Sequence, residues 1–293
     1  MSGGLSLPLP DGRALEVLSA GPEDGTVLIF HHGSPGAAVG YEPYIRACAD
    51  RHLRLVTYSR PGFGDSSRDE GRTVASCAGD TAAIADALGA ERFLTVGWSG
   101  GGAHALACAA LLPERVLACA TLAGVAPWDA VGLDWTSGMG EDNRIEYPTA
   151  ARDPQELLRW MEPRARAMAT IQPDHIVQTL RSLISEVDEV HVTGGFAEML
   201  AELFHRAFAN GLWGWFDDDL AFTRPWGVDL GSIRVPVSIW QGAQDLMVPS
   251  AHGEWLAANV RGARAELRAE HGHLSLVDAF GDILDGLLAR ARS

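Results

Sequence analysis

Three residue types that together perform nucleophilic catalysis occur in this chain in the order serine, acid, histidine. Ser99 lies in the run Gly97–Gly101, which matches the pattern G-x-S-x-G. Asp245 and His273 come much later, each shortly after a predicted strand. A serine hydroxyl attacks well only beside a base, and an imidazole base needs a carboxylate that fixes its tautomer. We therefore predict that Ser99, Asp245 and His273 form a catalytic triad.

A strand and a helix must hold Ser99 in place. The apolar run 92–98 predicts a buried strand, and the small residues of 101–112 predict a helix that stops at Pro113. The tight turn between them leaves room only for small neighbours of the serine. It lifts the hydroxyl above the sheet at the N-terminal end of the helix, where a developing negative charge is favoured.

A second turn can donate hydrogen bonds to that charge. The run His31–Gly36 (His-His-Gly-Ser-Pro-Gly) follows a predicted strand over 26–30. Its glycines and proline predict a sharp loop whose backbone N–H groups point inward. We predict that the N–H groups of Ser34 and Gly100 form an oxyanion hole, and that the two histidines orient the loop.

Alternating strands and helices predict the sheet that carries these turns. Continuous apolar runs separated by helical patterns are typical of a parallel sheet covered on both faces, so the predicted fold class is α/β. A β-hairpin of residues 5–9 and 14–19 precedes them. The predicted strands that follow are 26–30, 53–58, 92–98, 116–123, 235–241 and 263–269, and the last helix is 275–291.

The alternation is interrupted in the middle of the chain. Residues 127–230 contain no convincing central strand, and three helical stretches are predicted there instead. We therefore divide the chain into a core of residues 1–126 and 231–293 and a helical insertion of residues 127–230.

Aromatic residues in and near this insertion have two interpretations. They pack its interior, or they line an apolar pocket for an acyl or aromatic substrate. The acidic run Asp217–Asp219 is expected to be solvated. The candidate substrate-binding residues are Trp98, Trp135, Trp213, Trp215 and Phe216.

Composition excludes several other chemistries. The 23 basic residues against 38 acidic ones give a net charge of −15, and every basic residue is an arginine. Without lysine there is no Schiff base, no lysine-anchored pyridoxal phosphate and no P-loop lysine. The acidic balance argues against nucleic-acid or anionic-membrane partners. No metal site or cofactor is expected.

The cysteines, the lengths of the apolar runs and the N-terminal residues bear on the cellular location of the protein. The four cysteines form no C-x-x-C pair, which favours buried free thiols in a reducing compartment. We see no run of about 18 apolar residues and no secretory signal pattern at the N-terminus. We therefore expect a cytoplasmic protein.

Together these motifs resemble the α/β-hydrolase superfamily, in the branch with a helical cap. The run Ser59–Ser66 (Ser-Arg-Pro-Gly-Phe-Gly-Asp-Ser) strengthens the resemblance. It implies an eight-stranded, mostly parallel sheet with helices on both faces and a cap over the active site. It also implies that His273, rather than His271, is the base and that Asp245 is the acid, with Asp129 as an alternative.

The resulting functional hypothesis is a carboxylesterase-like serine hydrolase of a small apolar or aromatic ester or lactone. One alternative is an aminopeptidase similar to proline iminopeptidase, in which Glu141, Glu146 or Glu198 would bind the substrate's amine. Another is a C–C bond hydrolase, because fold does not dictate function. The third alternative is a ligand-binding protein that catalyses no reaction. The expected partner is a small-molecule ester or amide, and the oligomeric state is left open.

Overall fold

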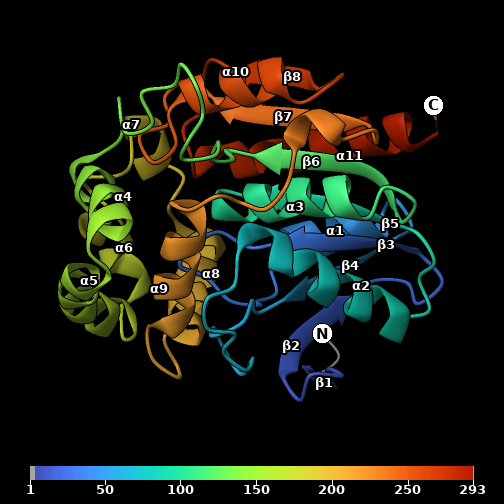
Figure 1. The fold of residues 1–293 in the computed structure, drawn as a ribbon, viewed down its shortest axis with the longest axis horizontal. Helices are drawn as coiled ribbons and strands as arrows, with labels where there is room; N and C mark the ends of the chain where they lie inside the picture. The colour runs from blue at the N-terminus through green and yellow to red at the C-terminus, as the bar shows by residue number, and fades with distance from the viewer. Residues whose placement is uncertain (1–3, 293) are drawn as a thin grey trace.

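Residues 4–292 are described in this computed structural model, and their strands form one sheet in the order β1-β2-β4-β3-β5-β6-β7-β8 (Figure 1). β1 and β2 pair antiparallel, and β2 also runs antiparallel to β4, whereas the later pairs are parallel. The predicted mostly parallel α/β sheet is therefore confirmed. The strands are β1 (Leu5–Pro8), β2 (Ala14–Ala20), β3 (Thr26–His31), β4 (Leu53–Tyr58), β5 (Phe93–Trp98), β6 (Val116–Leu122), β7 (Val237–Gly242) and β8 (Arg264–Arg268).

Helices cover both faces of this sheet, which explains why its central strands are apolar throughout. Every residue of β5 and β7 is buried. One hydrophobic cluster joins α1 and α11 to one face, and a second joins α2, α3 and α10 to the other. These helices are α1 (Glu42–Ala49), α2 (Cys77–Ala87), α3 (Gly100–Leu111), α10 (Ser250–Asn259) and α11 (Phe280–Ala291).

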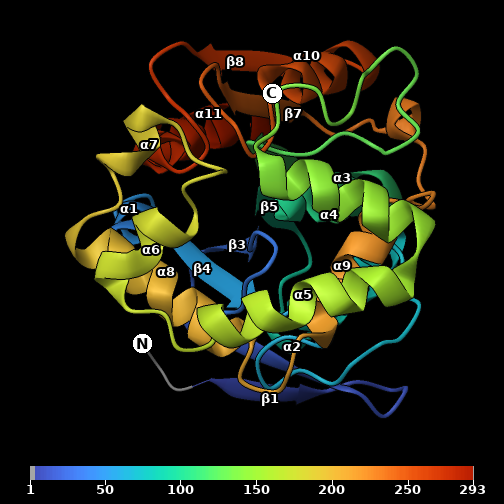
Figure 2. The same ribbon diagram turned by 90° about the vertical axis from the view of Figure 1, so that its left-hand side faces the viewer.

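The α-helices between β6 and β7 lie beyond the carboxyl ends of the parallel strands (Figures 1 and 2). Ligands bind at that edge of parallel α/β sheets. No helix within residues 4–292 has the length and apolarity that crossing a bilayer requires. The helices of this segment are α4 (Glu141–Arg152), α5 (Pro154–Met168), α6 (Ile176–Thr179), α7 (Glu186–Glu189), α8 (Gly194–Ala207) and α9 (Trp213–Phe222).

The acidic run in α9 corrects one prediction. Asp217, Asp218 and Asp219 were expected to be solvated, yet they are 3%, 0% and 1% exposed. Arginines from the core segment explain the burial of the first two, because Arg68 pairs with Asp217 and Arg60 pairs with Asp218. A buried carboxylate is tolerated when such a partner compensates its charge.

Candidate active site

The turn between β5 and α3 holds Ser99 in a backbone conformation that is uncommon for a residue with a side chain. Its φ and ψ are 55° and −127°, and such strain costs on the order of 1–3 kcal/mol. A Cβ added at Gly97 would overlap the carbonyl of Gly101, so this approach requires glycine. The N–H of Ser99 donates to the carbonyl of Leu122 on β6 (2.8 Å). The serine itself is half-buried and within reach of a small molecule.

Asp245 and His273 meet in a buried hydrogen bond. His273 Nδ1 lies 2.8 Å from Asp245 Oδ2, and their side chains are 2% and 0% exposed. Asp245 Oδ1 accepts the backbone N–H groups of Met247 (2.8 Å) and Val248 (2.7 Å), which fix the carboxylate. A proton on Nδ1 leaves Nε2 of the neutral ring as a proton acceptor. The alternative acid, Asp129, is exposed and makes no such contact.

The environment of His273 favours its protonated form. Burial alone lowers the pKa of its imidazole, whereas the charge and hydrogen bond of Asp245 and the charge of Asp188 raise it. The attraction outweighs the burial, and the pKa of His273 lies above its ordinary value of 6.5. The ring is therefore suited to take up a proton and hold it beside Asp245.

The loop after β3 packs directly against the serine turn. A Cβ added at Gly33 would lie 3.4 Å from Ser99 Cβ, and one added at Gly100 would lie 3.4 Å from Ser34 Cβ. The hydroxyl of Ser34 is buried with no hydrogen-bond partner in the described chain. The structure thus brings the two predicted oxyanion donors, Ser34 and Gly100, to the same place.

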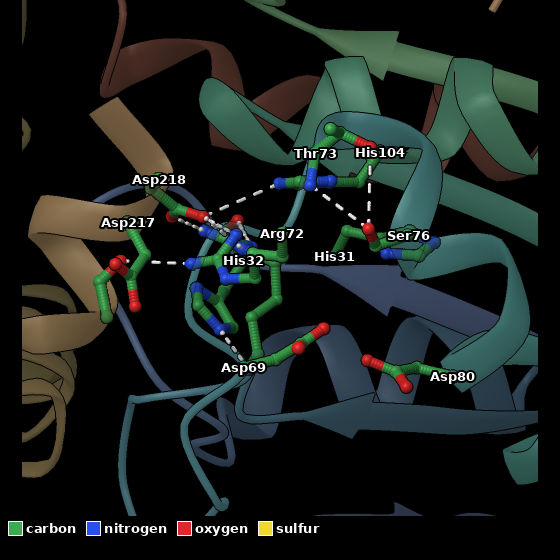
Figure 3. Close-up of polar contacts among 12 residues, drawn as sticks. His31, His32, Asp69, Arg72, Thr73, Ser76, Asp80, His104, Asp217 and Asp218 are labelled. Atoms are coloured by element: carbon green, nitrogen blue, oxygen red, sulfur yellow. Dashed lines mark hydrogen bonds and ion pairs between the residues drawn. The ribbon is translucent and has the colours of Figure 1, made fainter. Parts of the chain in front are cut away.

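A buried ion-pair network, which we did not predict from the sequence, braces that loop. The guanidinium of Arg60 donates to the carbonyls of His32 and Gly33 and forms a 2.6 Å ion pair with Asp218. Arg72 binds the other oxygen of Asp218 at 2.7 Å, as the cluster in Figure 3 illustrates. The acidic run and the run Ser59–Ser66, which contains Arg60, were the sequence signals for this network, but their residues Arg60 and Asp218 are 158 apart in the chain and nothing in the sequence paired them.

One cavity of about 180 Å³ joins these groups. Ser99, His273, Ser34 and Trp98 lie on its sheet side. Its opposite walls come from the helices between β6 and β7 and are mainly apolar. These wall residues include Tyr147, Trp160, Met168, Leu180, Leu183, Leu200, Leu203, Phe204 and Trp215.

Two of the five predicted substrate-binding residues, Trp98 and Trp215, line this cavity, and the other three lie outside it. Trp135 donates its indole N–H to the carbonyl of Ala126 (2.8 Å) and packs in the core beside α10. Trp213 is 41% exposed and stacks on Arg68, and Phe216 packs against Trp213. Hydrogen bonding and stacking elsewhere turn these rings away from the cavity.

The carboxyl of Glu146 forms a polar part of the cavity wall. Glu146 lines the cavity and accepts the indole N–H of Trp215 (2.6 Å). Burial raises the pKa of Glu146 to about 7, and burial with the nearby charge of Glu146 raises that of Asp219 well above its ordinary value. Glu141 and Glu198, the other amine-binding candidates, are exposed and outside this cavity.

The site also contains a carboxylate from α7 that sequence reasoning missed. Asp188 is fully buried and accepts hydrogen bonds from the loop that carries His273. Its position in a short acidic stretch gave no sign of that contact. No group of three or more histidine, cysteine or acidic side chains in residues 4–292 is arranged to hold a metal ion.

Comparison with known proteins adds three findings. A family model described as "alpha/beta hydrolase fold" matches residues 26–280. A proline iminopeptidase of Neisseria meningitidis serogroup B is 29% identical over 300 residues, covering 92% of each chain. A bifunctional esterase/perhydrolase of Acinetobacter calcoaceticus is 31% identical over 118 residues, which is 40% of this chain and 43% of that one.

Solved structures resemble the chain over its whole length. An esterase from Rhodococcus sp. ECU1013 superposes with a TM-score of 0.67 and 20% identity, covering 99% of both chains. Similarity at that identity concerns the fold alone. It supports the architecture of the sheet and its helices and says nothing about the substrate.

Proposed function

Because this chain belongs to the α/β-hydrolase fold family, we propose that it is a serine hydrolase that forms an acyl-enzyme on Ser99. The observation that carries the proposal is the buried Asp245–His273 pair, whose imidazole lines the same cavity as Ser99. A serine on a strained turn, a base with a raised pKa and a carboxylate behind that base are the parts that acyl transfer needs.

The proposed reaction has two steps. His273 Nε2 takes the proton of Ser99 Oγ as that oxygen attacks the substrate carbonyl, and the N–H groups of Ser34 and Gly100 stabilise the oxyanion. His273 then gives the proton to the leaving oxygen, and an ester Oγ–C bond remains on the enzyme. A water molecule then attacks this ester as His273 takes its proton, the Oγ–C bond breaks, and His273 returns the proton to Ser99 Oγ as the acid is released. Throughout, Asp245 holds the ring and stabilises its charged form.

The helices between β6 and β7 are proposed to act as a cap that selects the substrate. Support comes from the cavity, whose sheet side carries Ser99 and whose opposite walls belong to those helices. The walls are mainly apolar and the volume is about 180 Å³. These features favour a small apolar or aromatic ester or lactone.

Covalent labelling of Ser99 tests this function. The protein and its Ser99→Ala variant are treated with a fluorophosphonate and assayed with p-nitrophenyl esters of increasing acyl length. We expect labelling of the peptide that contains Ser99 and ester turnover, and the loss of both in Ser99→Ala. Ser137→Ala, at an exposed serine outside the cavity, is the matched control. Unlabelled, folded wild-type protein would refute the proposal.

A second candidate function, removal of an N-terminal residue from a peptide, rests on Glu146. This carboxyl lines the cavity, and burial raises its pKa to about 7, so a bound substrate ammonium would stabilise its ionised form. A relative covering 92% of the chain is named a proline iminopeptidase. The test compares proline p-nitroanilide with its N-acetyl form. Turnover of the free amine alone, weakened at least tenfold in Glu146→Gln, supports this function, whereas equal inertness of both anilides contradicts it.

A further inference from the structure

The carboxylate of Asp188 receives four hydrogen bonds from one short segment of the chain. Its oxygens accept the backbone N–H groups of His273 (2.9 Å), Leu274 (2.9 Å) and Ser275 (2.8 Å) and the hydroxyl of Ser275 (2.9 Å). Asp188 lies on α7, between β6 and β7, and it is 85 residues from His273 in the chain. It is fully buried.

The close approach is built into the loop. A Cβ added at Gly272 would lie 2.5 Å from Asp188 Oδ2, so only glycine before His273 lets the carboxylate reach three successive N–H groups. Ser275 strengthens the arrangement, because its hydroxyl donates to Asp188 and accepts the N–H of Gly272 (2.8 Å). Hydrogen bonds to an ionised acceptor are stronger than neutral ones. The backbone on both sides of His273 is thereby held.

We propose that Asp188 is a positioning residue for the base. From α7 it holds the loop of His273 in place relative to Ser99, and its negative charge stabilises the protonated imidazole. This proposal rests on the proposed function, in which His273 moves the proton. It adds a second acid to the site, one that acts through the backbone and through its field.

The charged groups that act on His273 are two carboxylates from different elements. Asp245 contacts the ring from the loop after β7, and Asp188 acts from α7. The neutral indole of Trp98, on β5, has its ring centroid 5.9 Å from that of the His273 imidazole. Both carboxylates raise the pKa of His273. Removing the charge of Asp188 therefore lowers that pKa, and the neutral, proton-accepting ring then persists to lower pH.

The experiment measures kcat, KM and the pH profile of kcat/KM for ester hydrolysis in Asp188→Asn. We expect kcat to fall by about 10- to 100-fold, KM to stay within about twofold, and the acid limb of kcat/KM to move down by about half a pH unit. Glu186→Gln is the matched control, since it removes an exposed carboxylate from the same helix. It should behave as wild type.

A second variant separates the hydrogen bonds from the charge. Ser275→Ala removes one donor to Asp188 and keeps its charge, so kcat should fall while the acid limb stays in place. If circular dichroism shows that Asp188→Asn does not fold, the Ser275→Ala variant alone tests the role of Asp188. Wild-type kcat in Ser275→Ala, or an unmoved acid limb in folded Asp188→Asn, overturns the role of Asp188. Fluorophosphonate labelling of Ser99 in the wild type keeps the proposed function separate from that result.

Discussion

At the scale of single residues, Ser99 is held in a backbone conformation that a residue with a side chain rarely adopts. Its positive φ is strained, and the turn persists because the surroundings over-determine it: β6 binds its N–H and glycines remove the clashes around it. Strain of this kind commonly marks a functional position, and here it coincides with the cavity that also contains His273.

Gly97 provides a test of that turn. In Gly97→Ala the new methyl group would overlap the carbonyl of Gly101, so we expect a loss of more than about 2 kcal/mol of unfolding free energy together with loss of Ser99 labelling. Urea unfolding measures the first and fluorophosphonate reactivity the second. Gly79→Ala is the control, because Gly79 lies in α2 with open space around it and should gain about 0.5–1 kcal/mol. Equal stability of the two variants would contradict the packing argument.

At the scale of elements, α9 joins the helical segment to the loop beside Ser99. Its Asp218 forms ion pairs with Arg60 and Arg72. Arg60 also donates hydrogen bonds to carbonyls of the loop after β3. Burial raises the pKa of Asp218, but the two arginines lower it more, and the pKa lies well below its ordinary value. A buried network of this kind stabilises a geometry because breaking it leaves charges unpaired.

Asp218→Asn should therefore cost about 3–5 kcal/mol of unfolding free energy at neutral pH, since two buried arginines lose their counter-charge. A carboxyl whose pKa is lower when folded adds stability above its unfolded pKa of about 3.9 and loses it as pH falls through the folded value. The difference from wild type should thus be constant between about pH 8 and pH 5 and shrink in stronger acid. Urea unfolding at several pH values measures it.

The control for this series is Asp174→Asn, whose side chain is 80% exposed. It should leave the unfolding free energy within about 0.5 kcal/mol of the wild type. A cost for Asp218→Asn no larger than that of the control would show that the network adds nothing to stability.

At the scale of the whole molecule, two parts of the chain jointly enclose the cavity. Ser99 and His273 lie on its sheet side, and the helices between β6 and β7 supply the apolar walls. Under the proposed function, chemistry and substrate choice belong to different parts of the chain, so a wall residue can be changed while Ser99 and His273 are kept. Leu183, half-buried and on the cavity wall, is such a position.

Leu183→Ala should shift the preferred acyl length of p-nitrophenyl esters toward longer chains, because it shortens a side chain on the wall and enlarges the cavity. The measurement is kcat/KM across the ester series, and labelling of Ser99 should continue at the wild-type rate. Leu158→Ala serves as control, since Leu158 is half-buried on α5 outside this cavity. An unchanged preference in Leu183→Ala would show that this wall does not contact the acyl chain.

The sequence alone determined the features whose causes lie within a few neighbouring residues. The turn at Ser99 is one, because its glycines are adjacent to the serine and backbone sterics act locally. The strands and their flanking helices are further such features, because the spacing of apolar residues in each segment reflects which of its faces is buried. The order of Ser99, Asp245 and His273 predicted a triad, and the structure brings Asp245 and His273 within 2.8 Å and places Ser99 and His273 on one cavity.

Only the tertiary structure decided the partners of buried charges and the lining of the cavity. Asp218 and Arg60 are 158 residues apart, and Asp188 and His273 are 85 apart. An acidic residue on a helix looks the same in sequence whether it faces water or a buried arginine. For the same reason the sequence could not separate Trp215, on the cavity wall, from Trp213, stacked on a surface arginine. Contacts between distant segments carry that information, and they exist only in the folded chain.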